Sequence, residues 1–313
     1  MSCSGDRGVR LDAAGRRAYR APVTRYRDAA APDYSHRYHA GNVGDVWKHC
    51  ALVEILRRTA AASRSVAYVE SHAGEGRYAL GPTGEWTEGI GRLWAAPAGD
   101  DAVGRYVALC RGLAPGATRP ETYPGSPAFA RGVLGPNAEL ELWERDAVAC
   151  ARLEAELRAD ARAHVRHGDG LSTLAAELRA AEKRVAAVVA LVDPPWTAKA
   201  DWSAVPEAVI SAARASTRAC IMLWYPLKSL TRPNAMLARF DRAGVGATTI
   251  ELVTTPLGER RPRLNGSGVL LVRPPADALA ALGAALPVIG AQCATRGSWS
   301  ARIVADARRP DAR

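Results

Sequence analysis

The four residues Asp193-Pro-Pro-Trp196 follow a long apolar run and have the chemical types needed to hold an aromatic amine. The prolines keep the backbone extended and donate no N–H, so the Pro194 carbonyl is free to accept a hydrogen bond beside the Asp193 carboxylate. Two acceptors on the N–H groups of an aromatic amine favour a pyramidal nitrogen, whose lone pair can then be aimed at a methyl group. Trp196 can stack on the face of a base that has left its helix. A simple turn with Trp196 in the core is the alternative, and we favour the amine site.

Polar residues or glycines also follow three earlier apolar runs. Gly74 and Gly76 lie in the turn Glu70-Ser-His-Ala-Gly-Glu-Gly76, and their missing Cβ atoms allow a ligand to approach the backbone. This turn is not GxGxxG, which argues against a dinucleotide. Glu144 could accept hydrogen bonds from ribose hydroxyls, and Asp169 could bind an adenine amino group. Each feature alone is compatible with a tight turn or a surface carboxylate, but together they predict a nucleoside cofactor.

The elements that position these residues alternate between strands and helices. Apolar runs alternating with helical patterns predict an α/β fold with a mostly parallel sheet, in which ligands bind at the carboxyl ends of the strands. The expected strands are 66–69, 138–143, 164–167, 185–192, 219–224, 247–254 and 268–273, and the expected helices include 45–60, 146–160 and 276–289.

Two segments fall outside this alternation. Residues 1–33 are rich in Arg, Ala and Asp without a clear period, which predicts a basic, disordered extension before a domain over 34–313. Residues about 77–122 contain several proline and glycine breaks and are too long for a strand-to-helix loop. We interpret them as an inserted helical subdomain, from which Pro124-Gly-Ser-Pro127 returns the chain to the core.

Composition limits the class of protein. The formal charge of +10 suits a polyanionic partner, although the arginine-rich composition could equally reflect the genome. The six cysteines form no CxxC pair, so we expect no metal site and a reducing compartment. We expect no membrane association, since no apolar stretch approaches the length of a span and the first residues lack a signal-peptide core.

Several motifs together resemble the RlmJ family, which methylates N6 of an adenine in 23S ribosomal RNA. The resemblance covers roughly residues 34–305. It rests on Tyr34-Ser-His-Arg-Tyr-His-Ala-Gly-Asn42, Gly44-Asp-Val-Trp-Lys-His49, Ser71-His-Ala-Gly74, Tyr123-Pro-Gly-Ser-Pro127, Asp193-Pro-Pro-Trp196 and Leu223-Trp-Tyr-Pro226, in the family's order.

The resemblance implies a class I Rossmann-like fold that binds S-adenosyl-L-methionine, with the helical subdomain inserted into it. It further implies a cytoplasmic enzyme that uses no metal, acts on protein-free or early-assembly 23S rRNA and is expected to be a monomer. Asp193 is implied as the catalytic acceptor. The implied cofactor contacts are His49, His72, Ser126, Glu144, Asp169, Gly170 and Asp193, and the implied substrate contacts are Tyr34, His36, Pro194 and Trp196.

The sequence departs from the family in two places. Trp196 stands where the family usually has Tyr, and residues 1–33 precede the family's usual start. Three other functions share parts of the pattern: a DNA adenine methyltransferase, an rRNA guanine-N2 methyltransferase and a non-enzymatic RNA-binding protein on the same scaffold. A DNA enzyme would normally carry a target-recognition domain, and the intact Asp193, Glu144 and Gly74 argue against a non-enzymatic protein.

Overall fold

An eight-stranded sheet forms the centre of the unit that begins at His36, in the strand order β10-β8-β9-β7-β6-β1-β4-β5. The structure is a computed structural model that describes residues 36–97, 99–113, 115–259 and 263–305, so the expected extension over 1–33 lies outside it. The strands of the sheet are β1 (Val66–Glu70), β4 (Ala138–Glu144), β5 (Ala163–His167), β6 (Ala187–Val192), β7 (Cys220–Leu227), β8 (Thr248–Val253), β9 (Gly266–Val272) and β10 (Ser300–Val304).

Strand direction divides the sheet into two parts. β5, β4, β1, β6 and β7 are parallel, whereas β9 is antiparallel to both β7 and β8, and β10 is antiparallel to β8. The fully buried runs of β1 and β9 are those expected of strands that are covered on both faces. The expected α/β fold with a mostly parallel sheet is therefore present, with an antiparallel edge that the sequence did not reveal.

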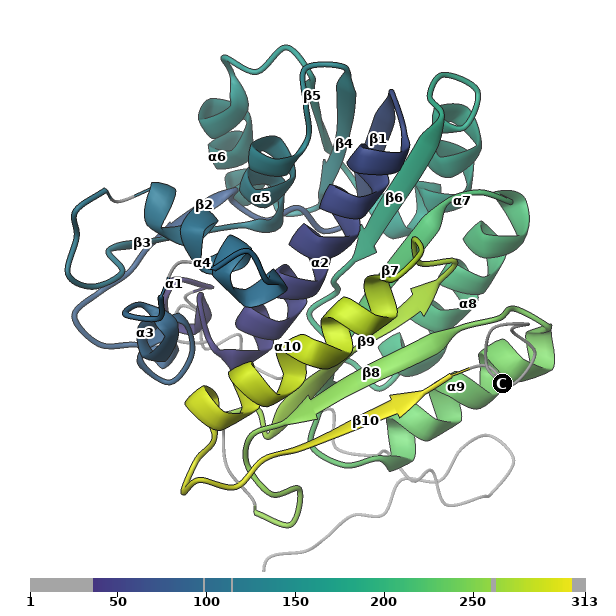
Figure 1. The fold of residues 1–313 in the computed structure, drawn as a ribbon. Helices are drawn as coiled ribbons and strands as arrows, with labels where there is room; N and C mark the ends of the chain where they lie inside the picture. The colour runs from purple at the N-terminus through teal and green to yellow at the C-terminus, as the bar shows by residue number, and fades with distance from the viewer. Residues whose placement is uncertain (1–35, 98, 114, 260–262, 306–313) are drawn as a thin grey trace, which may run out of the picture. The chain divides into compact units, whose positions relative to one another are not determined.

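Helices cover both faces of the sheet (Figure 1). α2, α4, α5, α6 and α10 lie over one face, and α7, α8 and α9 over the other, so that a separate buried apolar cluster fills each interface. The helices of the two layers are α2 (Val43–Ala62), α4 (Ala102–Gly112), α5 (Ser126–Val133), α6 (Ala147–Leu157), α7 (Gly170–Ala181), α8 (Asp201–Ala215), α9 (Thr231–Ala243) and α10 (Ala278–Cys293), and the short α1 (His36–His39) precedes them.

Helix α2 differs from its prediction. The sequence predicts an amphipathic helix over 45–60, buried along the face that bears Val46, Cys50, Val53 and Leu56. The structure buries α2 on nearly all sides, including Lys48, because it packs on the sheet and also contacts α4, α5 and α10. The prediction of a solvent-facing side was wrong, and Lys48, His49 and Glu54 of this helix lie in the interior.

The segment expected to be an insertion begins and ends in a pair of short strands. β2 (Arg77–Ala79) pairs antiparallel with β3 (Thr122–Pro124), and between them lie the 3₁₀ helix η1 (Glu85–Thr87), α3 (Ile90–Leu93) and α4. The backbone N–H of Gly125 donates to the Gly76 carbonyl at 2.8 Å, so the chain leaves and re-enters the core at neighbouring points.

Candidate active site

Asp193 follows β6 and forms an ion pair with a lysine from the buried helix α2. Lys48 Nζ lies 2.6 Å from Asp193 Oδ2 and 2.8 Å from Asp45 Oδ1. Burial alone would lower the pKa of Lys48, but the two carboxylates outweigh it and raise the pKa above its usual value. Within the described residues, Asp193 Oδ1 accepts no hydrogen bond, and its side chain is 17% exposed. The carboxylate is thus held from one side and can be reached from the other.

In the loop after Asp193, Pro194 lies beside the carboxylate, whereas Trp196 packs against other aromatic residues. Pro194 is buried directly beside the carboxylate. The backbone of Trp196 has a φ of 52°, its indole N–H donates to the Trp224 carbonyl at 3.0 Å, and its ring lies 4.4 Å from that of Trp202. Trp196 is only 9% exposed. In this state its ring packs inside the loop, so stacking on a base would require the ring to present a face that is now covered.

A buried carboxyl group, Glu70, ends β1 directly before the glycine turn. Ser126 donates a hydrogen bond to Glu70 Oε1, and the Tyr68 hydroxyl donates to Oε2 at 2.8 Å. Burial raises the pKa of Glu70 to about 8, although both hydrogen bonds oppose the shift. Ser126 begins α5, but Gly125 is its N-cap residue and provides no side-chain cap. The Ser126 hydroxyl therefore binds Glu70 in the interior.

The glycine turn is held by Glu144 at the end of β4. The backbone N–H of Gly74 donates to Glu144 Oε2 at 2.8 Å, and that of Asp146 donates to Oε1, also at 2.8 Å. Gly74 has a φ of +63°, and a Cβ there would lie 2.2 Å from the Tyr78 hydroxyl. Only glycine fits this turn without strain. Each Glu144 oxygen keeps a second lone pair with which it can accept from a ligand.

His72 shows that the strand ends converge. Burial lowers the pKa of His72, while the carboxylates of Asp193, Glu144 and Asp169 act in the opposite direction. Asp193 follows β6, Glu144 ends β4 and Asp169 follows β5. The charges at three strand ends therefore all act on the imidazole of His72. The structure thereby brings together four residues that the sequence selected from separate motifs.

Asp169 and Gly170 form the start of α7. Asp169 Oδ1 caps the helix by accepting from the backbone N–H groups of Leu171 and Ser172 at 3.1 and 3.4 Å. A Cβ on Gly170 would lie 2.4 Å from Trp143 Cβ and 2.6 Å from the Ser71 carbonyl. Gly170 thus permits close packing of α7 on the β1 turn, which is a structural requirement independent of any ligand.

His49 lies deeper than the other expected cofactor contacts. It is 2% exposed, its Nδ1 lies 2.8 Å from the Tyr123 hydroxyl, and its ring is 4.8 Å from that of Phe129. Burial, with the nearby Lys48 charge, lowers its pKa well below the usual value. His49 Nε2 has no hydrogen-bond partner among the described residues.

The expected substrate contacts at the start of the domain are only partly described. Tyr34 lies outside the described residues, and His36 begins α1, where its backbone alone is described. Lys48 and Glu70 are site residues that the sequence patterns did not single out. Glu70 did carry a signal, since it is an acidic residue at a strand end, whereas nothing in the spacing pointed to a contact between Lys48 and Asp193.

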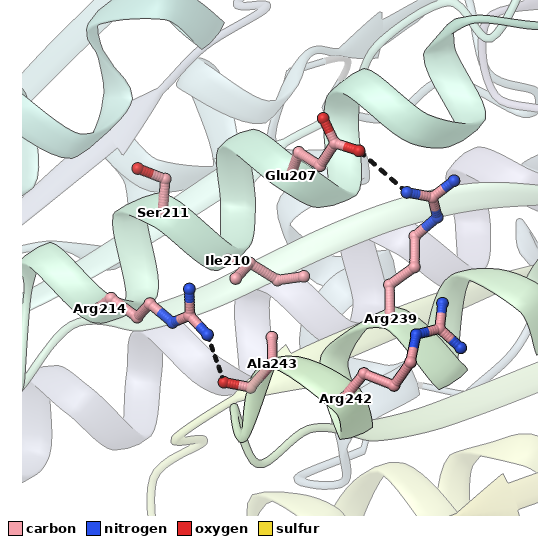
Figure 2. Close-up of a pocket in the computed structure, with 7 residues that line it drawn as sticks. All are labelled: Glu207, Ile210, Ser211, Arg214, Arg239, Arg242 and Ala243. Atoms are coloured by element: carbon pink, nitrogen blue, oxygen red, sulfur yellow. Dashed lines mark hydrogen bonds and ion pairs between the residues drawn. The ribbon is translucent and has the colours of Figure 1, made fainter.

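A surface hollow lies elsewhere, between α8 and α9 (Figure 2). Its volume is about 450 Å³. Arg239 pairs with Glu207 at 2.9 Å, and Arg214 donates to the Ala243 carbonyl at 2.6 Å. The residues that line it are Glu207, Ile210, Ser211, Arg214, Arg239, Arg242 and Ala243. None of the residues at the strand ends contributes to this hollow.

No group of three or more His, Cys, Asp or Glu residues in the described part of the chain is arranged to hold a metal ion. Among the described helices, none is long and apolar enough to cross a membrane.

Strand order, the glycine turn after β1 and the Asp-Pro-Pro-Trp loop after β6 define a class I Rossmann-like methyltransferase. A family model described as ribosomal RNA large subunit methyltransferase D, RlmJ, matches residues 63–305, and the chain belongs to this RlmJ family.

Known relatives agree with this assignment. The chain is 31% identical over 249 residues to ribosomal RNA large subunit methyltransferase J of Escherichia coli K12, covering 77% of this chain and 87% of that protein. It is 29% identical to the protein of the same name from Haemophilus influenzae, with the same coverage. The crystal structure of protein LPL1258 from Legionella pneumophila superposes with a TM-score of 0.78 at 26% identity, covering 86% of this chain and 99% of that one.

Proposed function

We propose that this protein transfers a methyl group from S-adenosyl-L-methionine to N6 of an adenine in 23S rRNA that is still free of ribosomal proteins. The observation that carries the proposal is the Asp193 carboxylate at the end of β6, held on one side by Lys48 and bordered by Pro194. Membership of the RlmJ family and the names of the relatives support ribosomal RNA as the substrate. Such a substrate is consistent with a cytoplasmic enzyme, and we expect it to act as a monomer and without a metal ion.

The residues at the strand ends fit the proposed cofactor. Glu144 retains acceptor capacity for ribose hydroxyls, and Asp169 lies at the neighbouring strand end for the adenine. His72, Ser126 and the buried Glu70 lie toward β1, where a polar amino-acid portion would be accommodated, and the His49 Nε2 atom, which has no partner in the described part of the chain, could also bind it. When bound, S-adenosyl-L-methionine supplies an electrophilic methyl group.

The residues of this chain then act on the target amine. Asp193 and the Pro194 carbonyl accept its two N–H groups, which favours a pyramidal nitrogen and directs its lone pair. As positive charge develops on that nitrogen, the fixed Asp193 carboxylate stabilises it, and the methylated nitrogen then loses one proton to solvent. The Lys48 ammonium does not cancel this charge, because Asp45 pairs with it too and two carboxylates share one cation.

Identification of the methylated nucleoside tests the proposal. The protein is incubated with methyl-labelled S-adenosyl-L-methionine and, separately, protein-free 23S rRNA, assembled large subunits and duplex DNA. We expect N6-methyladenosine from the free rRNA and little product from assembled subunits, where packed protein obstructs base flipping. N2-methylguanosine would favour the guanine enzyme, product only on duplex DNA would favour a DNA methyltransferase, and binding without transfer would favour a non-enzymatic protein.

A further inference from the structure

The inserted segment contributes a buried carboxylate, Glu85, that contacts the chain just before α2. Glu85 is 5% exposed. Its Oε2 accepts from Asn42 Nδ2 at 3.0 Å and lies 3.1 Å from His39 Nδ1. Arg263, which leads into β9, approaches the other oxygen, with Nε 3.7 Å from Oε1, and also pairs with Glu88. Groups from three parts of the chain therefore meet at one carboxylate.

Close backbone contact fixes the same junction. The N–H of Ile90 donates to the Gly41 carbonyl at 3.0 Å. A Cβ on Gly89 would lie 2.1 Å from that carbonyl, and Gly41 itself has a φ of +76°. A larger residue at Gly89 would clash with this turn, so the close packing of the insertion against the chain before α2 depends on glycine there.

From Glu85, polar contacts continue without a break to the Asp193 carboxylate. Asn42 is the N-cap of α2, and its Oδ1 accepts from the Asp45 N–H at 2.9 Å. Asp45 Oδ2 accepts from the Gly41 N–H at 2.9 Å, while its Oδ1 binds Lys48 at 2.8 Å. Lys48 in turn binds Asp193 at 2.6 Å. The Asn42 side chain is held by both Glu85 and the Asp45 N–H, and the Asp45 side chain by both the Gly41 N–H and Lys48. Each side chain therefore helps to orient the one that follows it.

We propose that Glu85 and Asn42 are positioning residues, through which the insertion sets the placement of Asp45 and Lys48 and thereby that of the Asp193 carboxylate. The proposal rests on the proposed function in its assignment of Asp193 as the acceptor of the target amine. A carboxylate displaced by about 1 Å loses much of its effect on the reacting nitrogen, because such catalysis depends on accurate orientation. The insertion thus acts on catalysis without contacting the reacting atoms.

A second buried carboxylate provides the matched control. Glu54 lies further along α2, is fully buried, and also connects α2 to the insertion, because Arg105 of α4 binds its Oε2 at 2.7 Å. Arg58 binds its Oε1 at 2.6 Å. Glu54 resembles Glu85 in burial and in bridging α2 to the insertion, but it is not part of the contacts that lead to Asp193.

The kinetic experiment compares Glu85→Ala, Glu85→Gln and Glu54→Ala with the parent protein. We expect Glu85→Ala to lower kcat for RNA methylation about tenfold, the order expected for a lost charged hydrogen bond, with cofactor affinity unchanged within about twofold. Glu85→Gln retains an acceptor for Asn42 and should recover part of kcat. An equal loss of kcat in Glu54→Ala, or a loss confined to cofactor affinity, would overturn the proposal.

A second variant and a second readout remain informative if Glu85→Ala folds poorly or if no methylation is found. Asn42→Ser keeps a good N-cap but cannot reach Glu85, so kcat should fall with little loss of stability. Hydrogen exchange followed by mass spectrometry over 36–50 reports the Gly41 and Asp45 amides without any substrate. Faster exchange in Glu85→Ala but not in Glu54→Ala supports the proposal, and unchanged exchange overturns it, whether or not the parent methylates RNA.

Discussion

The strand-end cluster around Asp193 and the arginine-lined hollow between α8 and α9 both concentrate charge, but they differ in how the charge is used. In the hollow, Arg239 of α9 binds Glu207 of α8, and Arg214 of α8 binds the Ala243 carbonyl of α9 (Figure 2). These two contacts join the helices. At the strand ends, Asp193 keeps an oxygen without a described partner, and carboxylates from three strands act on His72. We therefore base the candidate active site on the convergence of incompletely satisfied groups from separate elements, and not on concavity alone.

Substitution of Asp193 should have the largest effect on kcat and would test whether the strand-end cluster is the catalytic site. We expect Asp193→Ala to lower kcat by at least about 10²-fold, the scale seen when a preorganised electrostatic group is lost. The fold should survive, because the residue follows a strand and is partly exposed. Asp201→Ala is a matched control, since Asp201 caps a nearby turn by accepting from the Ala198 N–H at 2.9 Å. Parent-like turnover in Asp193→Ala would remove the catalytic assignment.

Glu144 should affect the cofactor rather than the chemical step. Glu144→Ala removes a charged acceptor and is expected to weaken binding of S-adenosyl-L-methionine by about 1.5–3 kcal/mol, measured by calorimetry. Asp146→Ala is the control, because Asp146 caps α6 by accepting from Val148 and Ala149 and should lower helix stability without changing cofactor affinity. Equal cofactor affinities for Glu144→Ala and the parent would contradict a ribose contact.

The buried Glu70 should make stability depend on pH. Its folded-state pKa of about 8 lies above its ordinary value of 4.5, so between these pH values the folded protein binds a proton that the unfolded chain has lost. Stability should therefore fall as the pH rises from about 4.5 to about 8, by at most about 1.4 kcal/mol per pH unit, and then level off.

Glu70→Gln cannot ionise and should lose this component of the pH dependence in urea unfolding at pH 5, 6, 7 and 8. Glu141→Gln is the contrasting control, because hydrogen bonds from His164 and Arg166 outweigh burial and lower the pKa of Glu141. Its stabilising contribution is present above its ordinary pKa and lost as the pH falls. The same pH slope in Glu70→Gln as in the parent would show that Glu70 is ionised in the folded protein.

The smallest effect is expected in the hollow. Arg242 is exposed on α9, and Arg242→Ala should change the free energy of unfolding by no more than about 0.5 kcal/mol. Cofactor affinity and kcat should match those of the parent. A tenfold fall in RNA methylation would break the comparison, because the hollow would then take part in the reaction.

The sequence predicted the parts of the site that depend on chain order. Alternating strands and helices bring strand ends to one edge, so the order of the motifs alone places Glu144, Asp169 and Asp193 near one another. Family membership and the α/β fold are confirmed. The roles of individual site residues stay predictions.

Other features depend on packing that local patterns do not encode. Lys48 and Asp193 are 145 positions apart and meet only because α2 is buried over β6. The edge strand β10 has a mostly exposed pattern, and β2 is three residues long, so neither carries a clear apolar period. The packing of Trp196 against Trp202 follows from a backbone conformation that is rare for a large side chain and could not be inferred from the motif.

That conformation has a consequence for the order of events in catalysis. A non-glycine residue at positive φ costs of the order of 1–3 kcal/mol and persists only when its surroundings determine it. At Trp196 the determinants are the hydrogen bond to Trp224 and the contact with Trp202, neither of which involves RNA. The conformational entropy of the loop is therefore lost during folding rather than when a base arrives, and an adenine can stack on Trp196 only after the ring uncovers the face that now packs inside the loop.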